Sequence, residues 1–332
     1  MIVTLLLLAP GQAWCWGDEG HQTVARIAAA HLTERARQAV ASLLKQDATF
    51  AAPPGTADTL AEAMARAAIW PDHMQGGKGA TAPWHYIDIG LFEGPSQIAA
   101  RCPQGNCIVA KMSQYLVNLK QHRADGAWPE SKELAFLMHF AGDIHQPLHC
   151  VSDADAGGNC VNVVGFEPMV NLHAVWDITL VRNLMAHDGP GMIAGMESRF
   201  RGKMRRWQDY GSIDQIAAES FGLAKSRVYG KARPRLPVIP KFIEVQPRNC
   251  ATEAPESLRN VKVDGPRSDG AGSLNVVRMQ LYKGGVRLAA MLNAIYSDSP
   301  EAESSTSASG TINSGSAVRN KPSRTSRISS AV

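Results

Sequence analysis

The chain has 332 residues, of which 45% are apolar and 19% are charged, an ordinary composition for a globular protein that can bury a large core. Its formal net charge is +4, but the last 32 residues carry four Lys or Arg side chains against two Glu side chains. The rest of the chain is therefore close to neutral, which argues against nucleic-acid binding through a strongly basic surface.

The chain begins with an apolar segment that resembles a secretory signal peptide. Apolar residues from Ile2 to Ala9 precede a Pro-Gly turn, and small residues stand three and one positions before Trp16. This arrangement predicts a signal peptide over residues 1–15, cleavage before Trp16 and a secreted or periplasmic protein. Two details depart from the usual signal peptide: no Lys or Arg precedes the apolar run, and Cys15 replaces the usual Ala. The position of the true start codon is therefore left open, and the alternative to a signal peptide is a buried N-terminal helix. The run is too short to span a membrane, and no other stretch is long enough.

Apolar residues with helical spacing recur along most of the chain. The regions that show this spacing are residues 21–45, 107–122, 132–149, 173–186, 190–207, 212–228 and 275–296. Alternating patterns typical of strands are scarce, and the best is the short run CVNVVGF at residues 160–166. We therefore predict an all-α fold, with a single mainly helical domain over residues 16–296.

Two segments differ from this pattern. Residues 230–272 hold six prolines, and we interpret them as a long irregular excursion within the domain. From residue 297 onward Ser, Thr, Gly and Ala dominate, which predicts a disordered tail over residues 297–332.

The chain contains six cysteines, a number that fits an exported protein. Cys102 and Cys107 bracket the turn-like sequence PQGN, which a local disulfide could close. After removal of the signal peptide the others are Cys150, Cys160 and Cys250, and their pairing cannot be deduced from the sequence.

The segment LAFLMHFAGDIHQPLHC, residues 134–150, places three histidines and an aspartate on a stretch that otherwise reads as a buried helix. His139 and Asp143 are four residues apart and share one helix face, and His145 and His149 form a second such pair. Pro147 is expected to end or kink the helix between them. Burying these groups unpaired would cost several kcal/mol, and a metal ion removes that cost by binding their lone pairs.

The same residue types recur in the motifs WGDEGH, IWPDHM, PWHYID and NLHAVWD. The residues concerned are His21, Asp72, His85, Asp88, His173 and Asp177. Imidazole and carboxylate ligands without a thiolate suit catalytic zinc, with iron or manganese as alternatives. So many candidates exceed one site and predict a polynuclear cluster with a bridging carboxylate. The alternative is a set of hydrogen-bonded core histidines with an ion-paired aspartate.

Six motifs together carry a resemblance to a known family. The chain resembles the zinc-dependent single-strand-specific nucleases of the S1/P1 type, which are similar to zinc phospholipase C, through WGxxGH, WPD, WHYID, HFAGDIHQPLHC, GGN…NLHAVWD and GGVRLAAMLN. The resemblance runs from Trp16 to Tyr296 and is weakest between residues 230 and 272. It implies a helical domain of the phospholipase C/single-strand nuclease type, with a cleft that holds three zinc ions per chain.

The resemblance also implies nine ligand residues, with Asp143 bridging two ions. The first ion would be held by Asp72, His85, His139 and Asp143, the second by His149, His173 and Asp177, and the third by His21, Asp143 and the α-amino and carbonyl groups of Trp16. His145 is not a ligand in the family pattern, and we expect it to support the ligands.

Two further residues have roles implied by the resemblance. Asp88 matches the family's acid beside the metal ions and is expected to orient or deprotonate the nucleophile, while zinc activates water and stabilises the leaving 3′-oxygen. The alternative for Asp88 is a hydrogen bond to a metal ligand. Tyr86 stands where the family presents an aromatic ring for stacking on an unpaired base, and a core tyrosine is the alternative.

Two positions depart from the family pattern. Gln75 stands where an Arg often holds phosphate, and Gly105 stands where an Asp often contacts the base. The substrate range is therefore open, and Lys78 is a candidate substitute cation.

The resemblance implies a secreted endonuclease and 3′-nucleotidase that cleaves single-stranded DNA and RNA and leaves 5′-phosphate ends. A zinc phospholipase C is the alternative enzyme, but the five-residue step from Trp16 to His21 and the Asp at 177 favour the nuclease. A non-enzymatic metal-binding helical protein is the third possibility, and it leaves Asp88 unexplained. The expected substrates are therefore single-stranded DNA and RNA and 3′-nucleotides. We expect no membrane span and no obligate protein partner.

Overall fold

A computed structural model describes residues 16–56, 58–74, 80–123, 127–164, 170–230, 239, 241–258, 262–264 and 272–297. The proposed signal peptide, residues 298–332 of the predicted tail, Gln75 and Lys78 lie outside the described residues. Helices make up most of the described part, and its only strands are three short ones, which confirms the predicted all-α class.

A break that the periodicity did not indicate divides the first helical region. Residues 21–45 belong to two helices, α1 (Asp18–Ala30) and α2 (Glu34–Gln46). The side chain of Thr33 accepts a hydrogen bond from the backbone N–H of Ala36, so a new helix begins there.

The third helix lies outside the helical regions that we predicted. Helix α3 (Leu60–His73) begins at a capping residue, Thr59, and contains Pro71 in its last turn. Its buried side chains are largely alanines, whose pattern of small residues gives a weak periodic signal. The cap at Thr59 is the local signal that could have revealed this helix.

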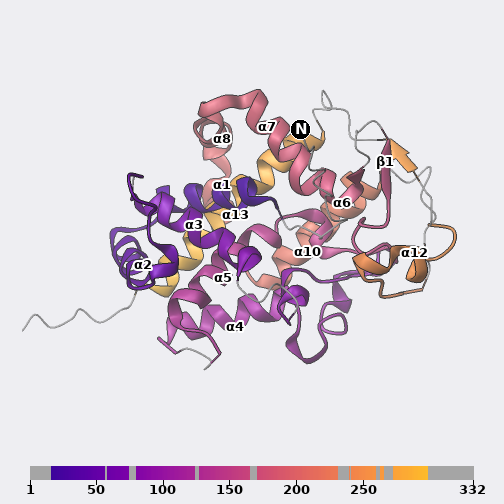
Figure 1. Cartoon of the computed structure of the whole chain (residues 1–332), viewed down its shortest axis with the longest axis horizontal. Coiled ribbons are helices and arrows are strands. Elements are labelled where there is room, and N and C mark those ends of the chain that lie inside the picture. The colour runs from indigo at the N-terminus through magenta and orange to yellow at the C-terminus, as the bar shows by residue number, and fades with distance from the viewer. Residues whose placement is uncertain are drawn as a thin grey trace, which may run out of the picture. The chain divides into compact units, whose positions relative to one another are not determined.

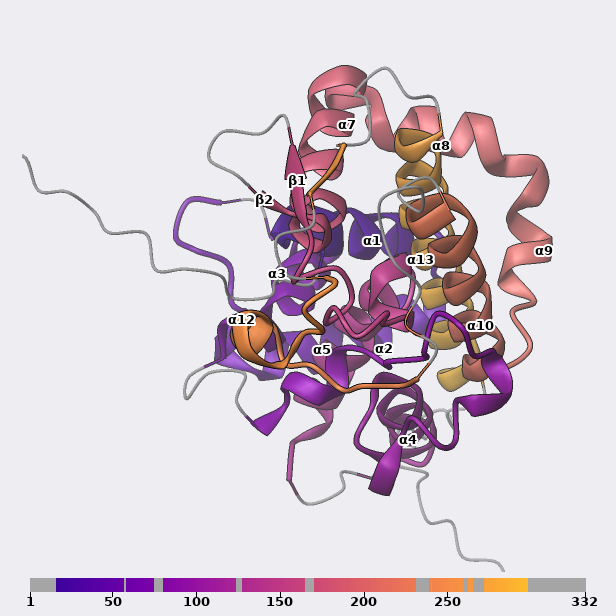
Figure 2. The same ribbon diagram turned by 90° about the vertical axis from the view of Figure 1, so that its right-hand side faces the viewer.

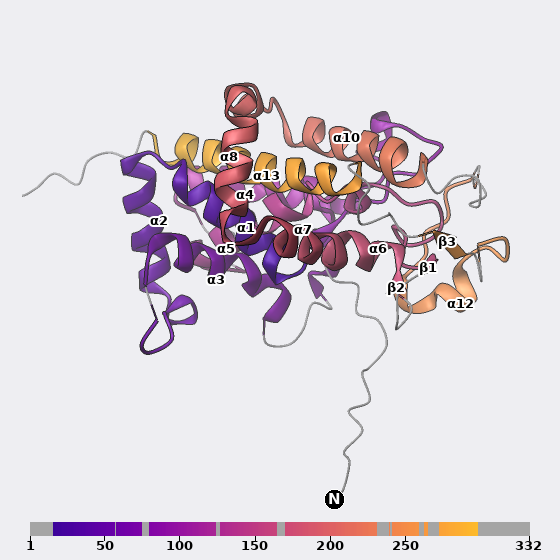
Figure 3. The ribbon, with the colours of Figure 1, turned by 90° about the horizontal axis from the view of Figure 1, so that it is seen from above.

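Helices α5 (Glu130–Asp143) and α13 (Ser273–Ile295) form the centre of the helical body (Figures 1 and 3). Helix α5 is buried on every side from Glu133 to Asp143. Helix α13 packs against α1, α5 and three later helices, α7 (Leu180–Asp188), α8 (Met192–Phe200) and α9 (Met204–Gln208). Gly285 permits a close approach of α13 to α1, because a Cβ atom there would come within 2.5 Å of Ile27.

The remaining helices follow the predicted regions closely, except for the short α12, which lies within the irregular excursion predicted for residues 230–272. They are α4 (Ile108–Lys120), α6 (Leu172–Ala174), α7 (Leu180–Asp188), α8 (Met192–Phe200), α9 (Met204–Gln208), α10 (Ile213–Leu223) and α12 (Cys250–Glu253). A 3₁₀ turn at Arg201–Lys203 separates α8 from α9. Helix α5 ends at Asp143, and a 3₁₀ turn at Pro147–Cys150 follows it, because Pro147 cannot continue a helix.

Three short strands form a small sheet at one end of the helical body (Figures 1 and 3), and the view onto that end shows β1 and β2 apart from α12 (Figure 2). Strand β1 (Asn162–Val164) pairs antiparallel with β2 (Val170–Asn171) and parallel with β3 (Lys262–Asp264). In this sheet Val163 lies opposite both Val170 and Val263. Strand β1 lies within the run CVNVVGF that we predicted as the best strand.

Two disulfides cross-link the described residues. Cys102 pairs with Cys107 across the PQGN turn, as the sequence predicted, and Cys160 pairs with Cys250. Cys150 is a buried free thiol. Among the described residues, no helix combines the length and the apolar character needed to cross a membrane.

Candidate metal centre

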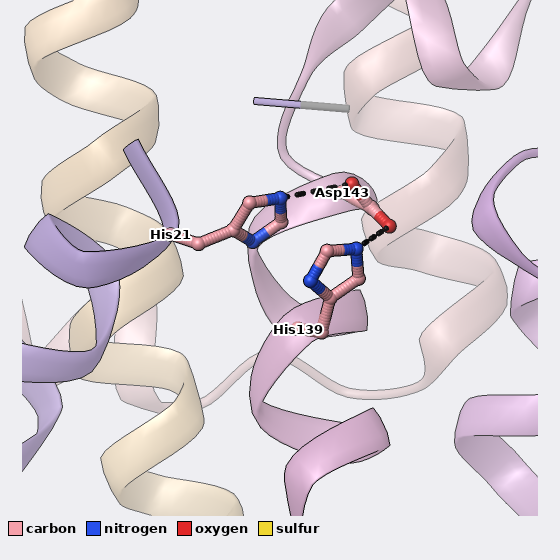
Figure 4. Close-up of side chains that lie close together, drawn as sticks. All are labelled: His21, His139 and Asp143. Carbon is pink, nitrogen blue, oxygen red and sulfur yellow. Dashed lines mark ion pairs between the residues drawn. The ribbon is translucent and has the colours of Figure 1, made fainter. Parts of the chain in front are cut away.

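The first group of metal-binding side chains lies where α1 meets α5. His139 and Asp143 lie one turn apart on α5, and His21 reaches them from α1 (Figure 4). The two oxygens of Asp143 face different imidazoles: Oδ1 lies 3.4 Å from Nε2 of His21, and Oδ2 lies 3.1 Å from Nε2 of His139. The two rings are stacked with their centroids 3.8 Å apart. One buried carboxylate therefore connects two helices.

A second group forms where the end of α3 approaches the same side chains. Asp72 comes from the last turn of α3, and His85 ends the 3₁₀ turn Ala82–His85. Nδ1 of His85 lies 3.7 Å from Oδ1 of Asp72 and 3.0 Å from Oδ2 of Asp143. His139 completes the group, with its Nε2 3.3 Å from Oδ1 of Asp72.

The third group comes from the segment that follows α5 and from α6. His173 lies in α6, and Asp177 lies in the π-helical turn Val175–Thr179. Their Nε2 and Oδ2 atoms are 3.0 Å apart, while Nε2 of His149 lies 3.7 Å from Oδ1 of Asp177. His149 also places Nδ1 3.5 Å from Oδ1 of Asp143. Asp143 thus contacts imidazoles of all three groups.

Each group offers one ligand atom per residue, and within a group these atoms lie within 4.8 Å of one another. The groups are His21, His139 and Asp143; Asp72, His85 and His139; and His149, His173 and Asp177. The structure therefore brings together the eight side chains that the family resemblance implied as ligands, although these residues are spread over more than 150 positions of the sequence.

Backbone carbonyls determine which ring nitrogen of three histidines faces the groups. Nδ1 of His139 lies 2.7 Å from the carbonyl oxygen of Ala68, Nδ1 of His149 lies 2.9 Å from that of His85, and Nδ1 of His173 lies 2.7 Å from that of Gly157. A carbonyl oxygen only accepts, so each Nδ1 carries the hydrogen. The Nε2 lone pairs are left to face the groups, as in metal-ligating histidines.

Several buried atoms at the three groups lack a hydrogen-bond partner among the described residues. They are both ring nitrogens of His21, Oδ1 of Asp143, Nε2 of His149 and Oδ2 of Asp177. Leaving a buried polar atom unsatisfied costs about 1–3 kcal/mol. Metal ions placed among these atoms would remove that cost, so the residues present fit a metal centre.

The imidazoles around the Asp143 carboxylate differ in their pKa, because burial lowers it for some of them and neighbouring carboxylates raise it for others. Burial lowers the pKa of His21 and His85, and it lowers the pKa of His149 to about 4. Burial opposes ionisation of Asp143 as well, but the surrounding imidazoles, His139 first, hold the pKa of Asp143 well below its usual range. For His139 the effect of burial is outweighed by Asp143 and Asp72, which raise its pKa to about 10. A metal ion must therefore displace a proton from His139.

Trp16 lies directly beside the groups. Its side chain is completely buried, and its Nε1 donates a 2.8 Å hydrogen bond to the carbonyl oxygen of Gly142. The backbone N–H of Gly17 donates to the carbonyl oxygen of Asp177 at 3.1 Å. The backbone at residues 16 and 17 is thus held between the end of α5, next to Asp143, and the turn that carries Asp177.

A pocket of about 120 Å³ adjoins the groups. Its lining comes from residues 82–88, 148–159 and 245–247 and from His173. The lining residues are Ala82, His85, Tyr86, Asp88, Leu148, His149, Ala156, Gly157, Asn159, His173, Val245, Gln246 and Pro247.

Asp88 lines this pocket but belongs to none of the three groups. Burial, followed by the charges of Asp155 and Glu244, raises the pKa of Asp88 to about 7. Gly105 is not among the lining residues.

His145 faces away from the groups toward α13. Its Nδ1 donates to the carbonyl oxygen of Ala141 at 2.8 Å, and its Nε2 accepts a 3.0 Å hydrogen bond from Arg287. Burial and the charge of Arg287 lower the pKa of His145 to about 3. Both ring nitrogens are therefore engaged in holding the turn after α5.

Gln146 stands inside the histidine-rich segment, but it was not among the predicted site residues. Its Nε2 donates a 2.5 Å hydrogen bond to Oδ1 of Asp177, and its Oε1 accepts from the backbone N–H of Leu148 at 2.6 Å. Gln146 therefore orients one candidate ligand and starts the turn that carries another, His149. Its position between two histidines of the motif was the available signal.

Comparisons with known proteins found a family and several similar sequences. The model of the family described as S1/P1 Nuclease matches residues 16–297. Endonuclease 4 of Arabidopsis thaliana is 27% identical over 316 residues, which cover 87% of this chain and 92% of that protein. Nuclease S1 of Aspergillus oryzae is 28% identical over 173 residues, covering 50% of this chain and 54% of that protein. Nuclease P1 of Penicillium citrinum is 26% identical over 178 residues, covering 51% and 60%.

The close packing of α5 against His21 leads to a prediction about metal content. A Cβ atom at Gly142 would come within 2.6 Å of Nδ1 of His21, so Gly142→Ala should displace that imidazole. We expect the variant to stay folded, because alanine favours helix, and to lose about one metal ion per chain, measured by elemental analysis.

The matched control is Gly222→Ala in α10, where an added Cβ atom meets nothing within 4 Å. This control should keep its full metal content and a melting temperature at or above that of the wild type. Full metal content in Gly142→Ala would contradict the placement of His21 as a ligand.

Proposed function

The chain belongs to the S1/P1 nuclease family, and on that premise we propose that it is a secreted, zinc-dependent endonuclease and 3′-nucleotidase. Membership supports a nuclease that hydrolyses phosphodiester bonds of nucleic acids. The finer proposal is that its substrates are single-stranded DNA, RNA and 3′-nucleotides and that its products carry 5′-phosphates. The observation that carries it is the convergence of three His and Asp groups on Asp143, beside a pocket that Tyr86 and Asp88 line.

We propose zinc as the metal, with three ions per chain. Imidazole nitrogens and carboxylate oxygens without a thiolate suit catalytic zinc. The proposed ligands are Asp72, His85, His139 and Asp143 for the first ion, His149, His173 and Asp177 for the second, and His21, Asp143 and the backbone of Trp16 for the third. When bound, zinc would activate water and stabilise the negative charge that develops during cleavage at phosphorus.

The protein's own contribution is to hold the ligands still and to fix which of their atoms face the metal ions. The carbonyl oxygens on Nδ1 of His139, His149 and His173 keep each imidazole in one tautomer. Gln146 holds the carboxylate of Asp177. Because these contacts come from buried helices and turns, the ligands need little reorganisation when ions bind.

We propose that Tyr86 and Asp88 act on the substrate rather than on the metal. Both line the pocket, and neither belongs to a metal-binding group. The Tyr86 ring would stack on a base, which requires that the base be unpaired and unstacked from a duplex. This requirement accounts for a single-strand preference in a protein that carries little net charge. Asp88 would orient or deprotonate the attacking nucleophile.

The two disulfides and the proposed role of the Trp16 α-amino group support a secreted or periplasmic protein. Two disulfides join the described residues, and disulfides persist in oxidising compartments outside the cytosol. A free α-amino group at Trp16 also requires removal of residues 1–15. An amide nitrogen in mid-chain is a poor ligand, whereas an α-amino group has an unperturbed pKa of about 8 and can release its proton to a metal near neutral pH.

The proposed function can be tested on the purified protein that begins at Trp16. It should contain about three zinc ions per chain, degrade single-stranded DNA and RNA faster than duplex DNA, and leave 5′-phosphate ends. A chelator should abolish this activity, and added zinc should restore it. Hydrolysis of phosphatidylcholine in place of nucleic acid would assign the chain to the phospholipase C alternative, and chelator-resistant cleavage would refute the metal mechanism.

A substitution at Asp88 tests its role in the reaction. Asp88→Asn should keep the zinc content and melting temperature but lower kcat on single-stranded DNA by about 100-fold, the usual scale of general acid–base catalysis. Asp209→Asn, at an exposed aspartate of the helical body, is the matched control and should leave kcat unchanged. Loss of zinc from Asp88→Asn would show a ligand role, and a rise in KM alone would show base binding.

The N-terminal requirement yields a separate prediction. A protein that keeps an extra Met before Trp16 should lack about one zinc ion and be largely inactive, because its Trp16 nitrogen is an amide. The protein cleaved before Trp16 should have full zinc and full activity. Intact-mass spectrometry would establish the start of each protein, and elemental analysis its zinc content. Equal zinc in both forms would remove Trp16 from the proposed ligand set.

A further inference from the structure

One side of the pocket is built by a segment to which the proposed chemistry assigns no role. Val245, Gln246 and Pro247 contribute to the lining, and they lie in the part of the chain where the motif resemblance was weakest. We call residues 244–250 the wall segment. Because the same pocket is lined by His85, His149 and His173, any group bound at the metal centre and extending into the pocket lies next to this segment.

The wall segment is held firmly in place. Its last residue, Cys250, is linked by a disulfide to Cys160, which directly follows Asn159, another lining residue. The backbone N–H of Gln246 donates to Oε2 of Glu253 at 3.1 Å, and the Asn249 side chain donates to Oε1 of the same carboxylate at 2.6 Å. The disulfide thus ties the wall segment to another part of the pocket, and the two hydrogen bonds fix the segment's own conformation where it leads into α12.

Gln246 presents an oriented carboxamide at this pocket. Its Nε2 donates to Oε1 of Glu244 at 3.2 Å, and it lines the same pocket as Tyr86. The bond to Glu244 leaves the carboxamide with capacity for three more hydrogen bonds, since it carries two N–H donors and two acceptor lone pairs. The carboxamide of the wall segment and the ring proposed to stack on a base therefore face one pocket.

We propose that Gln246 is a specificity-determining residue, whose carboxamide hydrogen-bonds to the edge of the base stacked on Tyr86. This inference rests on the proposed nuclease function and assigns it base selectivity. Each base presents its own pattern of donors and acceptors along its edge, and a carboxamide held in one orientation matches some patterns better than others. A base that cannot match leaves polar groups unpaired inside the pocket, which weakens transition-state binding.

The test measures kcat/KM for the 3′-phosphates of adenosine, guanosine, cytidine and uridine. For the wild type we expect the best and worst of the four to differ by at least about tenfold, the effect of one or two hydrogen bonds. Gln246→Met keeps the length of the side chain and removes its hydrogen bonding, so this ratio should shrink to within about threefold. The ratio cancels any loss common to all four substrates.

The matched control is Gln38→Met on α2, where the exposed glutamine donates to Glu34 and lies outside the pocket lining. It should preserve the ratio. A double variant, Cys160→Ser with Cys250→Ser, releases the wall segment without touching Gln246. It should also lower the ratio while zinc content stays at the wild-type value, which separates positioning of the wall from damage to the metal centre.

Two results would overturn the inference. One is a wild type that does not discriminate among the four nucleotides. The other is an unchanged ratio in Gln246→Met, including the case in which that variant loses activity equally on all four nucleotides. Failure of the proposed function looks different. In that case the zinc-loaded wild type would hydrolyse none of the four nucleotides and no single-stranded nucleic acid.

Discussion

The buried carboxylate of Asp143 is the constraint on which the rest of this structure depends. It is completely buried at the end of α5 and lies within 3.5 Å of four imidazoles, those of His21, His85, His139 and His149. A charge in such a place is tolerated only if its surroundings compensate it. The four imidazoles come from α1, α5 and two 3₁₀ turns, so compensation of one carboxylate brings together elements from the first half of the chain.

Close helix packing makes this convergence possible. Glycines stand where a Cβ atom would collide: at Gly20 with Trp16, at Gly142 with His21, and at Gly285 with Ile27. They bring α1 near both α5 and α13. Behind α5, Arg287 of α13 hydrogen-bonds to His145 and to Glu219, which fixes the turn that leads to His149. The metal-binding side chains are therefore held by rigid, buried elements, as a preorganised site requires.

The pocket combines this rigid centre with a second, chemically different region. On the side of the metal-binding groups, imidazoles face inward because backbone carbonyls occupy their Nδ1 atoms. On the other lining segments, Tyr86 and Gln246 present an aromatic ring and a carboxamide. Such a division is what the proposed substrate requires, since metal ions held by the three groups would supply reactivity and the remaining lining would supply recognition.

The sequence by itself determined the class of fold and the family, and it predicted the eight side chains that the structure brings together in three groups. Helical periodicity is a local property, so α4, α10 and α13 could be located closely, while the break at Thr33 and the alanine-rich α3 were missed because capping and small-residue packing barely affect periodicity. The eight imidazole and carboxylate side chains stood out through their motifs, and the resemblance sorted them into three sets.

Only the tertiary structure decided which atoms meet. It paired Cys160 with Cys250, which the sequence had left open because any two of three cysteines could pair. It placed Gln146 on Asp177 and Gln246 in the same pocket as Tyr86, and these pairs of residues stand 31 and 160 positions apart in the sequence. It also turned His145 toward Arg287 and away from the metal-binding groups. Contacts of this kind depend on how helices pack, and the packing of distant helices leaves no periodic trace in either segment alone.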